Sequence, residues 1–343
     1  MNQIFYCRIA FFLFIVSSNI CAVDHAEAGV VGVNYGMLGD NLPTPNNVIS
    51  LLKSKNITRV RLFAPNPDVL NALQGSGIEL ILGTLNQDIP ILGTDPSFAQ
   101  NWINTNIVPY AKNVNFRCIG VGNEVIPSDL AVHVLSAMEN LNAALKAAEL
   151  AIPISTTVST AVLGTSFPPS RGEFLEAVVE IMRSIIEFLA ANKSPLLVNV
   201  YPYFAYIYNQ ENIPLDYVLF TANRVVVRDG KYEYKNLFDA MTDAMYSALE
   251  KVNGDDVEIV ISESGWPSAQ NGDIATIANA KTYNNNLIAH VIGTYGTPKR
   301  AGKNIETYLF AIFNEDLKPA GTEQNFGLYY PNMTEVYCVN FSP

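Results

Sequence analysis

The chain has 343 residues, 49% hydrophobic and 15% charged, a composition that can fill a large core and is unlike that of a disordered chain. Its net charge is −11 and it contains no run of lysine or arginine, which argues against nucleic acid or an anionic membrane as a partner. The length is compatible with two domains or with one closed α/β barrel.

The first 28 residues have the pattern of a secretory signal peptide. Arg8 precedes a short apolar run, Ile9–Val16, and the small residues Ala26 and Ala28 stand where a signal peptidase needs them. The alternative, a membrane anchor, is disfavoured because the run is too short to span a bilayer. We therefore expect cleavage after Ala28, a mature chain of residues 29–343, and secretion to the extracellular space.

Eight short runs rich in β-branched and apolar residues recur along the chain. Most are continuously apolar, which is the pattern of strands buried on both faces of a parallel sheet. Because helical patterns separate them, the eight units predict a single (β/α)8 TIM barrel of class α/β. The predicted strands lie within residues 29–36, 57–64, 78–84, 117–124, 152–159, 195–202, 257–264 and 306–315.

Amphipathic stretches between these runs predict the helices. Thr44 and Pro45 form a good cap and first-turn pair, and Ser128 is the expected cap of a long alanine-rich helix. The longest interruption, from Phe204 to Tyr234, predicts an excursion between the sixth and seventh strands and not a second domain. The predicted helices span residues 44–54, 97–112, 128–150, 172–192, 234–252 and 276–295.

Two of the predicted strands end on a glutamate. The run "VEIVISES" reaches Glu263, and "RCIGVGNE" ends on Asn123 and Glu124. Active sites of such barrels lie at the C-terminal ends of the strands, and we expect strands four and seven to face each other across the mouth. A single glutamate at a strand end is more often a cap or an ion-pair partner. Two of them, each at the end of a mostly apolar run, favour hydrolysis of a glycosidic bond by a protonated acid and an ionised carboxylate.

The sequence lacks the residue patterns that other catalytic chemistries require. Beyond the leader, the histidines are His133 and His290, both in helical patterns, so no Ser-His-Asp triad or zinc cluster is indicated. Neither GxGxxG nor GxxxxGK[ST] occurs, so we expect no cofactor and no metal. Cys118 and Cys338 lie in apolar runs and are expected to be buried thiols, with a bridge as the alternative. Candidate glycan sites are the sequons at Asn56, Asn192, Asn332 and Asn340.

Several motifs occur in a recognisable order: "VGNEV" and "ISESGWPS", together with "STAVLGTSFPPS", "VNVYPYF", "NLFDAM", "TPKR" and "ETYLFAIFNEDLKPAG". With these motifs the chain resembles the plant β-1,3-glucanases, glycoside hydrolase family 17, over essentially the whole of residues 29–343. The resemblance implies a secreted, retaining endo-glycosidase that hydrolyses β-1,3-glucan. We expect a monomer whose only partner is the polysaccharide.

By this resemblance Glu124 is the acid/base and Glu263 the nucleophile. The supporting polar residues of the family fall on Glu315, Lys318 and Glu323. Glu315 is expected to end the eighth strand, and Lys318 to hold positive charge near the nucleophile and keep it ionised. One segment departs from the family, since Phe63 and Ala64 stand where "IYD" is common.

A sugar also needs apolar walls, because aromatic rings pack against its C–H groups. The expected platforms are Tyr35 after the first strand, Tyr201 and Phe204 after the sixth, and Phe326 after the eighth, with core packing as the alternative. Asn123 is expected to hydrogen-bond the sugar 2-hydroxyl.

Two rival functions stand beside hydrolysis of β-1,3-glucan. The family also hydrolyses mixed β-1,3;1,4-glucan with the same carboxylates, and nothing in the sequence of the site separates the two substrates. A non-catalytic glucan-binding wall protein is expected to have lost one of the two glutamates, and both are present.

Overall fold

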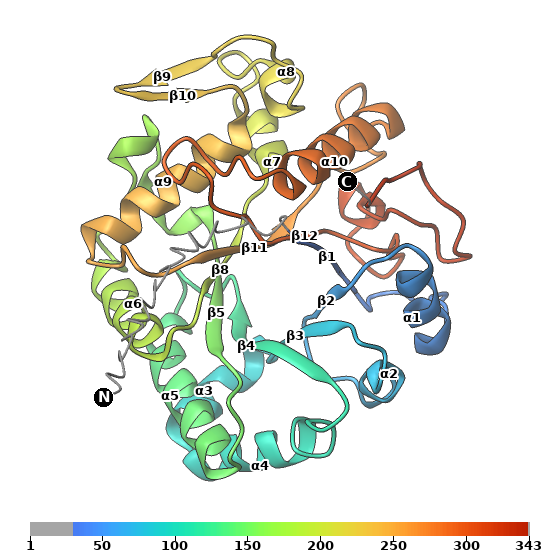
Figure 1. Ribbon diagram of the computed structural model, residues 1–343, viewed down its shortest axis with the longest axis vertical. Coiled ribbons are helices and arrows are strands. Elements are labelled where there is room, and N and C mark those ends of the chain that lie inside the picture. Colours follow the sequence, from blue (N-terminus) through green and yellow to red (C-terminus); the bar gives the residue numbers. More distant parts are fainter. Residues whose placement is uncertain (1–29, 342–343) are drawn as a thin grey trace, which may run out of the picture.

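Eight parallel strands close into a barrel at the centre of the structure, a computed structural model that describes residues 30–341 (Figure 1). The last strand pairs with the first, so the sheet is closed. The predicted single (β/α)8 barrel is confirmed, and each predicted run overlaps one barrel strand. In chain order these are β1 (Val31–Asn34), β2 (Arg59–Leu62), β3 (Glu79–Gly83), β4 (Asn115–Asn123), β5 (Ile154–Ser159), β8 (Leu196–Asn199), β11 (Ile259–Ser264) and β12 (Thr307–Leu309).

Helices surround the barrel and connect its strands (Figure 1). They are α1 (Pro45–Ser54), α2 (Pro67–Leu73), α3 (Ile89–Thr94), α4 (Pro96–Asn106), α5 (Ala131–Ala147), α6 (Val179–Asn192), α7 (Pro202–Tyr208), α8 (Leu215–Val218), α9 (Leu237–Lys251) and α10 (Ile277–Ile292). A proline stands in the first turn of α1, α2, α4 and α7, where a missing N–H is tolerated. The expected cap Ser128 was wrong: Leu130 holds the cap position of α5, and Ser128 Oγ accepts the N–H of Leu130 at 3.2 Å.

The predicted helix at residues 172–192 begins later than its sequence pattern indicated. Gly172 packs closely against α9, and a Cβ at this position would lie 1.9 Å from the carbonyl oxygen of Ala244. The chain therefore runs extended here and turns into α6 only at Val179. The extended part contributes to a small antiparallel pair, β6 (Leu163–Thr165) and β7 (Glu173–Phe174).

The predicted excursion between the sixth and seventh barrel strands is confirmed. Between β8 and β11 the chain forms α7, α8 and an antiparallel hairpin of β9 (Val227–Asp229) and β10 (Tyr232–Tyr234) before it enters α9. The hairpin projects at the edge of the molecule, beyond α9 (Figure 1). Tyr234 Oη donates to Asp243 Oδ2 on α9 at 3.0 Å, which anchors the hairpin.

The eighth strand is shorter than the run predicted at residues 306–315. β12 ends well before Glu315, so the expectation that Glu315 ends this strand was wrong. The reason is that Ala311 exchanges backbone hydrogen bonds with a returning C-terminal segment: its N–H donates to Phe326 O at 3.0 Å, and its oxygen accepts the N–H of Leu328 at 2.9 Å. Burial and apolar character continue past β12, but the regular ladder does not.

A cluster of charges closes the N-terminal end of the barrel. Arg59 at the start of β2 pairs with Glu79 at the start of β3 and, at 2.9 Å, with Glu306 just before β12. Arg117 on β4 also reaches Glu306, at 3.1 Å, and Tyr308 Oη donates to it at 2.8 Å. Two arginines thus face two glutamates, and we call these four charged residues the basal cluster.

The two cysteines of the described chain differ in environment. Cys118 is buried on β4 as expected, but the same expectation for Cys338 was wrong, since this residue is exposed. Near the chain end, Val339 and Tyr337 are buried while Cys338 between them faces solvent. No helix within residues 30–341 is long and apolar enough to cross a membrane. The predicted signal peptide lies outside the described residues.

Candidate active site

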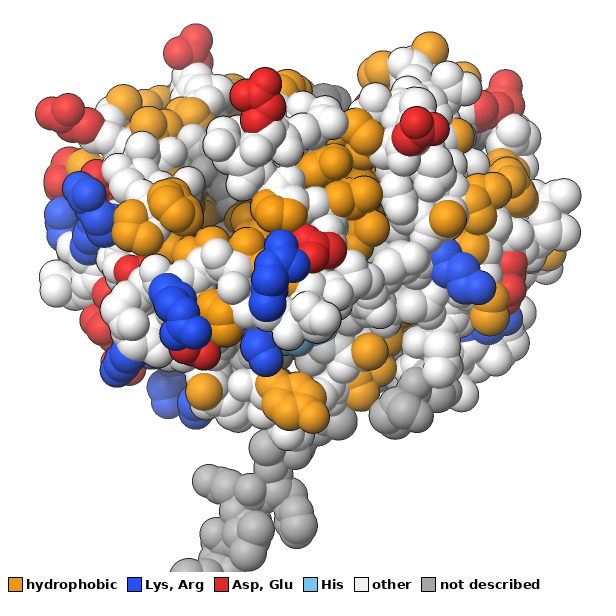
Figure 2. Space-filling view, turned by 90° about the horizontal axis from the view of Figure 1, so that it is seen from above, with side chains coloured by type: hydrophobic (Ala, Val, Ile, Leu, Met, Phe, Trp, Pro, Cys, Tyr) orange, Lys and Arg blue, Asp and Glu red, His pale blue; other side chains and the backbone are white. Residues whose placement is uncertain are grey.

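The C-terminal ends of the barrel strands open into a cavity of about 1050 Å³. All eight barrel strands contribute to its lining: β11 through Glu263 near its C-terminal end, and the others through strand ends or the segments that follow them. The space-filling view shows a depression between raised parts of the surface, with hydrophobic side chains on its walls (Figure 2). The volume reaches the upper end of the ~300–1,000 Å³ typical of small-molecule sites, which suits a chain-like ligand.

All ten residues predicted for the site line this one cavity. They are Tyr35, Asn123, Glu124, Tyr201, Phe204, Glu263, Glu315, Lys318, Glu323 and Phe326. They come from distant parts of the sequence, and the barrel brings them together.

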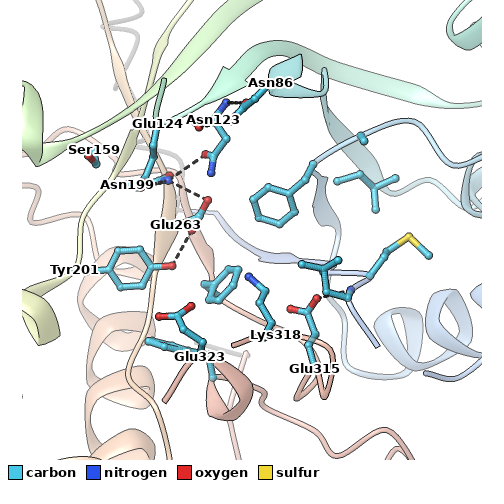
Figure 3. A pocket seen from close by; sticks show the side chains of 18 of the residues that line it. Asn86, Asn123, Glu124, Ser159, Asn199, Tyr201, Glu263, Glu315, Lys318 and Glu323 are labelled. Atoms are coloured by element: carbon cyan, nitrogen blue, oxygen red, sulfur yellow. Dashed lines mark hydrogen bonds between the residues drawn. The ribbon is translucent and has the colours of Figure 1, made fainter. Parts of the chain in front are cut away.

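The Asn199 side chain, at the end of β8, bridges the two glutamates. Its Nδ2 lies 2.7 Å from Glu124 Oε1 and 2.9 Å from Glu263 Oε1 (Figure 3). These two oxygens are therefore at most about 6 Å apart, which fits the ~5–5.5 Å of retaining glycosidases and is too close for the ~6.5–9.5 Å of inverting ones. Ser262 Oγ donates to Asn199 Oδ1 at 2.8 Å and so fixes the amide with its nitrogen toward the carboxylates.

The two glutamates do not stand on opposite strands, as the sequence had suggested. Only β5 and β8 separate β4 from β11 on one side of the ring, so the strands are three positions apart and not four. Because β8 lies next to β11 and close to β4, its last residue reaches both carboxylates at once. This shorter separation is what allows one amide to contact both.

Glu263 receives donors on both carboxylate oxygens. Arg61 Nη1 lies 2.6 Å from Oε1, where the Asn199 amide also donates, and Tyr201 Oη donates to Oε2 at 2.8 Å (Figure 3). Glu263 is only 6% exposed and Arg61 only 2%. A guanidinium and two neutral donors thus complement negative charge on this buried carboxylate. Such a group suits nucleophilic attack.

Glu124 has a different environment. Its one hydrogen-bonding side-chain partner among the described residues is Asn199, and part of the residue is open to the cavity. Partial burial raises the pKa of its carboxyl group because the ionised form loses hydration, and the negative charge of Glu263 raises that pKa further. Glu124 thus keeps a proton to higher pH than an ordinary glutamate, as a general acid requires.

The backbone around Glu124 is held in an uncommon conformation. Glu124 itself has φ 56°, in the left-handed region that non-glycine residues seldom adopt, and its N–H donates to Thr157 O at 3.0 Å. Asn86 clamps the preceding residue: its Oδ1 accepts the N–H of Asn123 at 2.8 Å, and its Nδ2 donates to Asn123 O at 3.0 Å. These bonds aim the Glu124 side chain into the cavity, and Asn86 was not predicted for the site.

Asn123 is part of the same hydrogen-bond network. Its Oδ1 accepts from Arg61 Nη2 at 2.8 Å and from Asn199 Nδ2 at 3.2 Å. The carbonyl oxygen of this amide is therefore occupied by protein donors, and its NH₂ group is the part left to donate to a ligand. The expected contact with a sugar hydroxyl stays a prediction, which this orientation favours.

Arg61 is the site residue that the sequence reasoning missed. It lies in the middle of "RVRL" on β2, and its guanidinium contacts Glu263 and Asn123 while the ring of Phe63 packs 4.5 Å from it. A signal was present, because an arginine near the C-terminal end of a buried strand requires a buried anionic partner. Asn199 was missed for a similar reason, since "VNVYPYF" was considered only for its aromatic residues.

Lys318 has a different partner from the one expected. The cation in contact with Glu263 is Arg61, whereas Lys318 Nζ lies 5.0 Å from the ring centre of Phe310 and its charge lowers the pKa of Glu315. Burial acts more strongly and leaves the pKa of Glu315 raised. Glu323 follows β12 in a short 3₁₀ turn and is half-buried at the cavity wall (Figure 3).

The predicted aromatic platforms form one packed group with unequal exposure. Tyr201 meets Phe204 and Phe326 at ring-centre distances of 5.3 and 5.9 Å, and its hydroxyl is bound to Glu263. Phe326 and Tyr35 are almost fully buried, whereas Phe204 is half-buried. Tyr201 therefore positions Glu263, and Phe204 offers more ring surface to a ligand than Tyr35 or Phe326. Sugar contacts by these rings stay predictions.

No group of His, Cys, Asp and Glu side chains within the described part of the chain is arranged to hold a metal ion. The chemistry available at this site is that of two carboxylates with different donors.

Comparisons with known proteins agree with this geometry. The family described as "Glycosyl hydrolases family 17" matches residues 31–341. A "Glucan endo-1,3-beta-glucosidase" of Vitis vinifera is 51% identical over 319 residues, covering 91% of this chain and 92% of the relative. "Lichenase-2" of Hordeum vulgare is 46% identical over 312 residues, covering 91% and 98%. A solved β-1,3-glucanase and allergen of Cryptomeria japonica pollen is 47% identical with a TM-score of 0.88, covering 91% of this chain and 99% of that one. The chain belongs to glycosyl hydrolases family 17.

Proposed function

We propose that the protein is a retaining endo-glycosidase that hydrolyses β-1,3-glucan. The observation that carries this is the pair Glu124 and Glu263, which share the Asn199 amide while only Glu263 meets a cation. Two carboxyl groups at this separation, one ionised and one protonated, are what a double-displacement glycosidase needs. Family membership and relatives named as glucan endo-1,3-beta-glucosidases support the choice of substrate.

The reaction proceeds in two steps. In the first, the Glu263 carboxylate attacks the anomeric carbon while Glu124 gives its proton to the oxygen of the leaving sugar, and the glycosidic bond breaks. In the second, Glu124, now ionised, takes a proton from water, whose oxygen attacks the anomeric carbon and releases Glu263. Arg61 and Tyr201 stabilise the negative charge of Glu263 before attack and after release.

Cleavage within a chain requires a cleft that the polymer can cross. The C-terminal ends of the barrel strands and the segments that follow them line the cavity, which is far larger than one sugar ring needs. The volume and the open rim support endo-hydrolysis over removal of a terminal sugar.

Substrate choice is decided by hydrolysis assays. We expect the protein to release reducing sugar faster from laminarin, a β-1,3-glucan, than from cereal mixed-linkage glucan. Proton NMR of the first product should show the β-anomer. The alternative substrate is favoured by the 46% identity to a relative named Lichenase-2, and faster release from mixed-linkage glucan would establish it. Absence of hydrolysis of either polymer would leave a glucan-binding wall protein.

We also propose that the protein is secreted to the cell wall space and acts as a monomer. The signal-like pattern of residues 1–28 supports secretion. Protein sequencing of material secreted by an expressing plant cell should give Gly29 as the first residue, and size-exclusion chromatography should give the mass of one chain. An N-terminus at Met1 in the cell extract would contradict secretion.

A further inference from the structure

We propose that residues 36–41, which follow β1 and are called here the rim segment, form the wall of an outer sugar subsite. The subsite binds a glucosyl unit on the glycone side of the cleaved bond, and Glu315 and Asp316 hold its wall in place. This rests on the proposed function and adds binding residues to it.

The rim segment presents apolar surface to the cavity. Met37 is 39% exposed and Leu38 is 53% exposed, and both line the same cavity as Glu263. A single exposed aliphatic residue needs no explanation, but two neighbours in continuity with a carbohydrate cleft form a surface against which the C–H face of a sugar ring can pack. A bound glucosyl unit would remove this surface from water.

Glu315 ties the rim segment to the opposite end of the chain. Its Oε1 accepts the N–H of Leu38 at 2.7 Å, and the N–H of Leu317 donates back to Leu38 O at 3.0 Å. The carboxylate lies so close to the segment that a Cβ on Gly36 would be 2.2 Å from Glu315 Oε2. A side chain at this position would have to displace the Glu315 carboxylate, so the segment and the carboxylate pack directly against each other.

Asp316 makes a second tie further along the segment. Its Oδ1 accepts the N–H of Asp40 at 3.2 Å, and its Oδ2 accepts from Asn41 Nδ2 at 2.8 Å. Two consecutive carboxylates thus hold both halves of an exposed loop whose apolar residues would otherwise be free to fold back. A wall fixed before binding loses less conformational entropy when the sugar arrives.

The position of this wall indicates which part of the glucan it meets. Glu315 and Lys318 lie on the far side of the cavity from Glu124 (Figure 3). The acid Glu124 faces the leaving sugar, so the wall beyond Glu315 faces the glycone. Among the described residues no hydrogen bond or ion pair joins the rim segment to Glu124 or Glu263, so the segment lies outside the hydrogen-bond network of the catalytic pair.

The test uses nitrophenyl β-laminari-oligosides whose glycone grows from two to four glucosyl units. The leaving group is constant, so only glycone subsites vary. For Leu38→Ser, and for Asp316→Ala, we expect KM for the longest glycone to rise about threefold to tenfold with kcat within about twofold. The loss should grow with glycone length. Asp316→Asn, which keeps an oxygen for the Asp40 N–H, should lose less than Asp316→Ala.

A matched control is Val132→Ser, which removes an exposed aliphatic side chain on α5 that does not line the cavity. It should follow the wild type at every length, and thermal midpoints show whether each variant is folded. Losses that are equal at all lengths, or that appear only on whole laminarin, would overturn the glycone subsite. If the wild type cleaves none of these substrates, the proposed function fails instead.

Discussion

The two ends of the barrel carry similar charged residues in different proportions. In the basal cluster, Arg59 and Arg117 face Glu79 and Glu306, so the charges match. At the catalytic end, two cations stand among four carboxyl groups: Arg61 and Lys318 with Glu124, Glu263, Glu315 and Glu323. The two arginines Arg59 and Arg61 come from one strand, two residues apart, and so point to the same side of β2.

The difference shows that interactions between charged side chains serve two purposes in this barrel, stability at one end and catalysis at the other. Where charges match, every carboxylate has a cationic partner, and the cluster joins β2, β3, β4 and the start of β12. Where negative charge is in excess, a carboxyl group gains by holding a proton: partial burial raises the pKa of Glu124, and the negative charge of Glu263 raises that pKa further. The basal cluster stabilises the barrel, and the unmatched end supplies an acid.

The largest expected effect on activity comes from removing the negative charge of Glu263, which Arg61 and Tyr201 contact. Glu263→Gln should lower kcat on laminarin by ~10⁴-fold or more, because the covalent step is lost. The amide is nearly isosteric, so circular dichroism and the thermal midpoint should show a folded protein. Turnover near the wild-type rate would show that Glu263 is not the nucleophile.

Removing the proposed acid should cost less and change the pH profile. Glu124→Gln is expected to lower kcat on laminarin by ~10²–10⁴-fold. An aryl glycoside with an acidic leaving group should lose less in the first step, since its departure needs little proton transfer. Because the raised pKa of Glu124 sets the basic limb of kcat/KM in the wild type, that limb should disappear in the variant. A basic limb that persists unchanged would assign the acid to another residue.

Arg61 and Arg59 allow the two ends to be compared within one strand. Arg61→Met should lower kcat/KM by about 10²-fold, because the negative charge on Glu263 loses its buried cation. The charge of Arg61 lowers the pKa of Glu124, so its loss should move the basic limb to higher pH.

The control for this change is Arg59→Met, which should alter stability and leave the pH profile in place. If both variants shift the basic limb equally, the two ends are not electrostatically separate. If neither does, Arg61 holds the site by packing alone.

The smallest effect on activity is expected at the basal cluster. Glu306→Gln breaks two partly buried ion pairs, and should lower the free energy of unfolding by ~1–3 kcal/mol in urea denaturation. Its kcat/KM at 25 °C should stay within about twofold of the wild type. A loss of activity without a loss of stability would mean that the lower end also shapes the site.

The sequence allowed the fold and the two glutamates to be predicted because both signals are local. A strand buried on both faces is apolar throughout, and a carboxylate that ends such a strand stands out. Arg61 and Asn199 were not predicted, because their meaning depends on β2, β8 and β11 meeting in the closed ring. The expectation for Cys338 was wrong for the converse reason: "VYCVNF" has the composition of a strand, but Cys338 faces solvent between the buried Tyr337 and Val339.

The strand boundaries near the C-terminus were also beyond local reasoning. Residues 310–313 are as apolar as a barrel strand, yet part of their hydrogen bonding goes to the returning segment at Phe326 and Leu328. These hydrogen-bond partners are distant in the sequence, so a local pattern cannot identify them. It also determines where Glu315 emerges, and hence which loop it holds.

The Asn199 amide has a consequence for the division of labour between the glutamates. As a donor that never titrates, it treats the two carboxyl groups almost alike, at 2.7 and 2.9 Å. The hydrogen bonds of Asn199 are therefore nearly symmetric, and they would be the same if the two glutamates exchanged the roles of nucleophile and acid. The symmetry is broken at Glu263, where Arg61 donates to the same oxygen as Asn199 and Tyr201 donates to the other oxygen. We therefore infer that the position of Arg61 determines which glutamate acts as nucleophile and which as acid. Exchanging these roles would require moving an arginine while both glutamates stay in place.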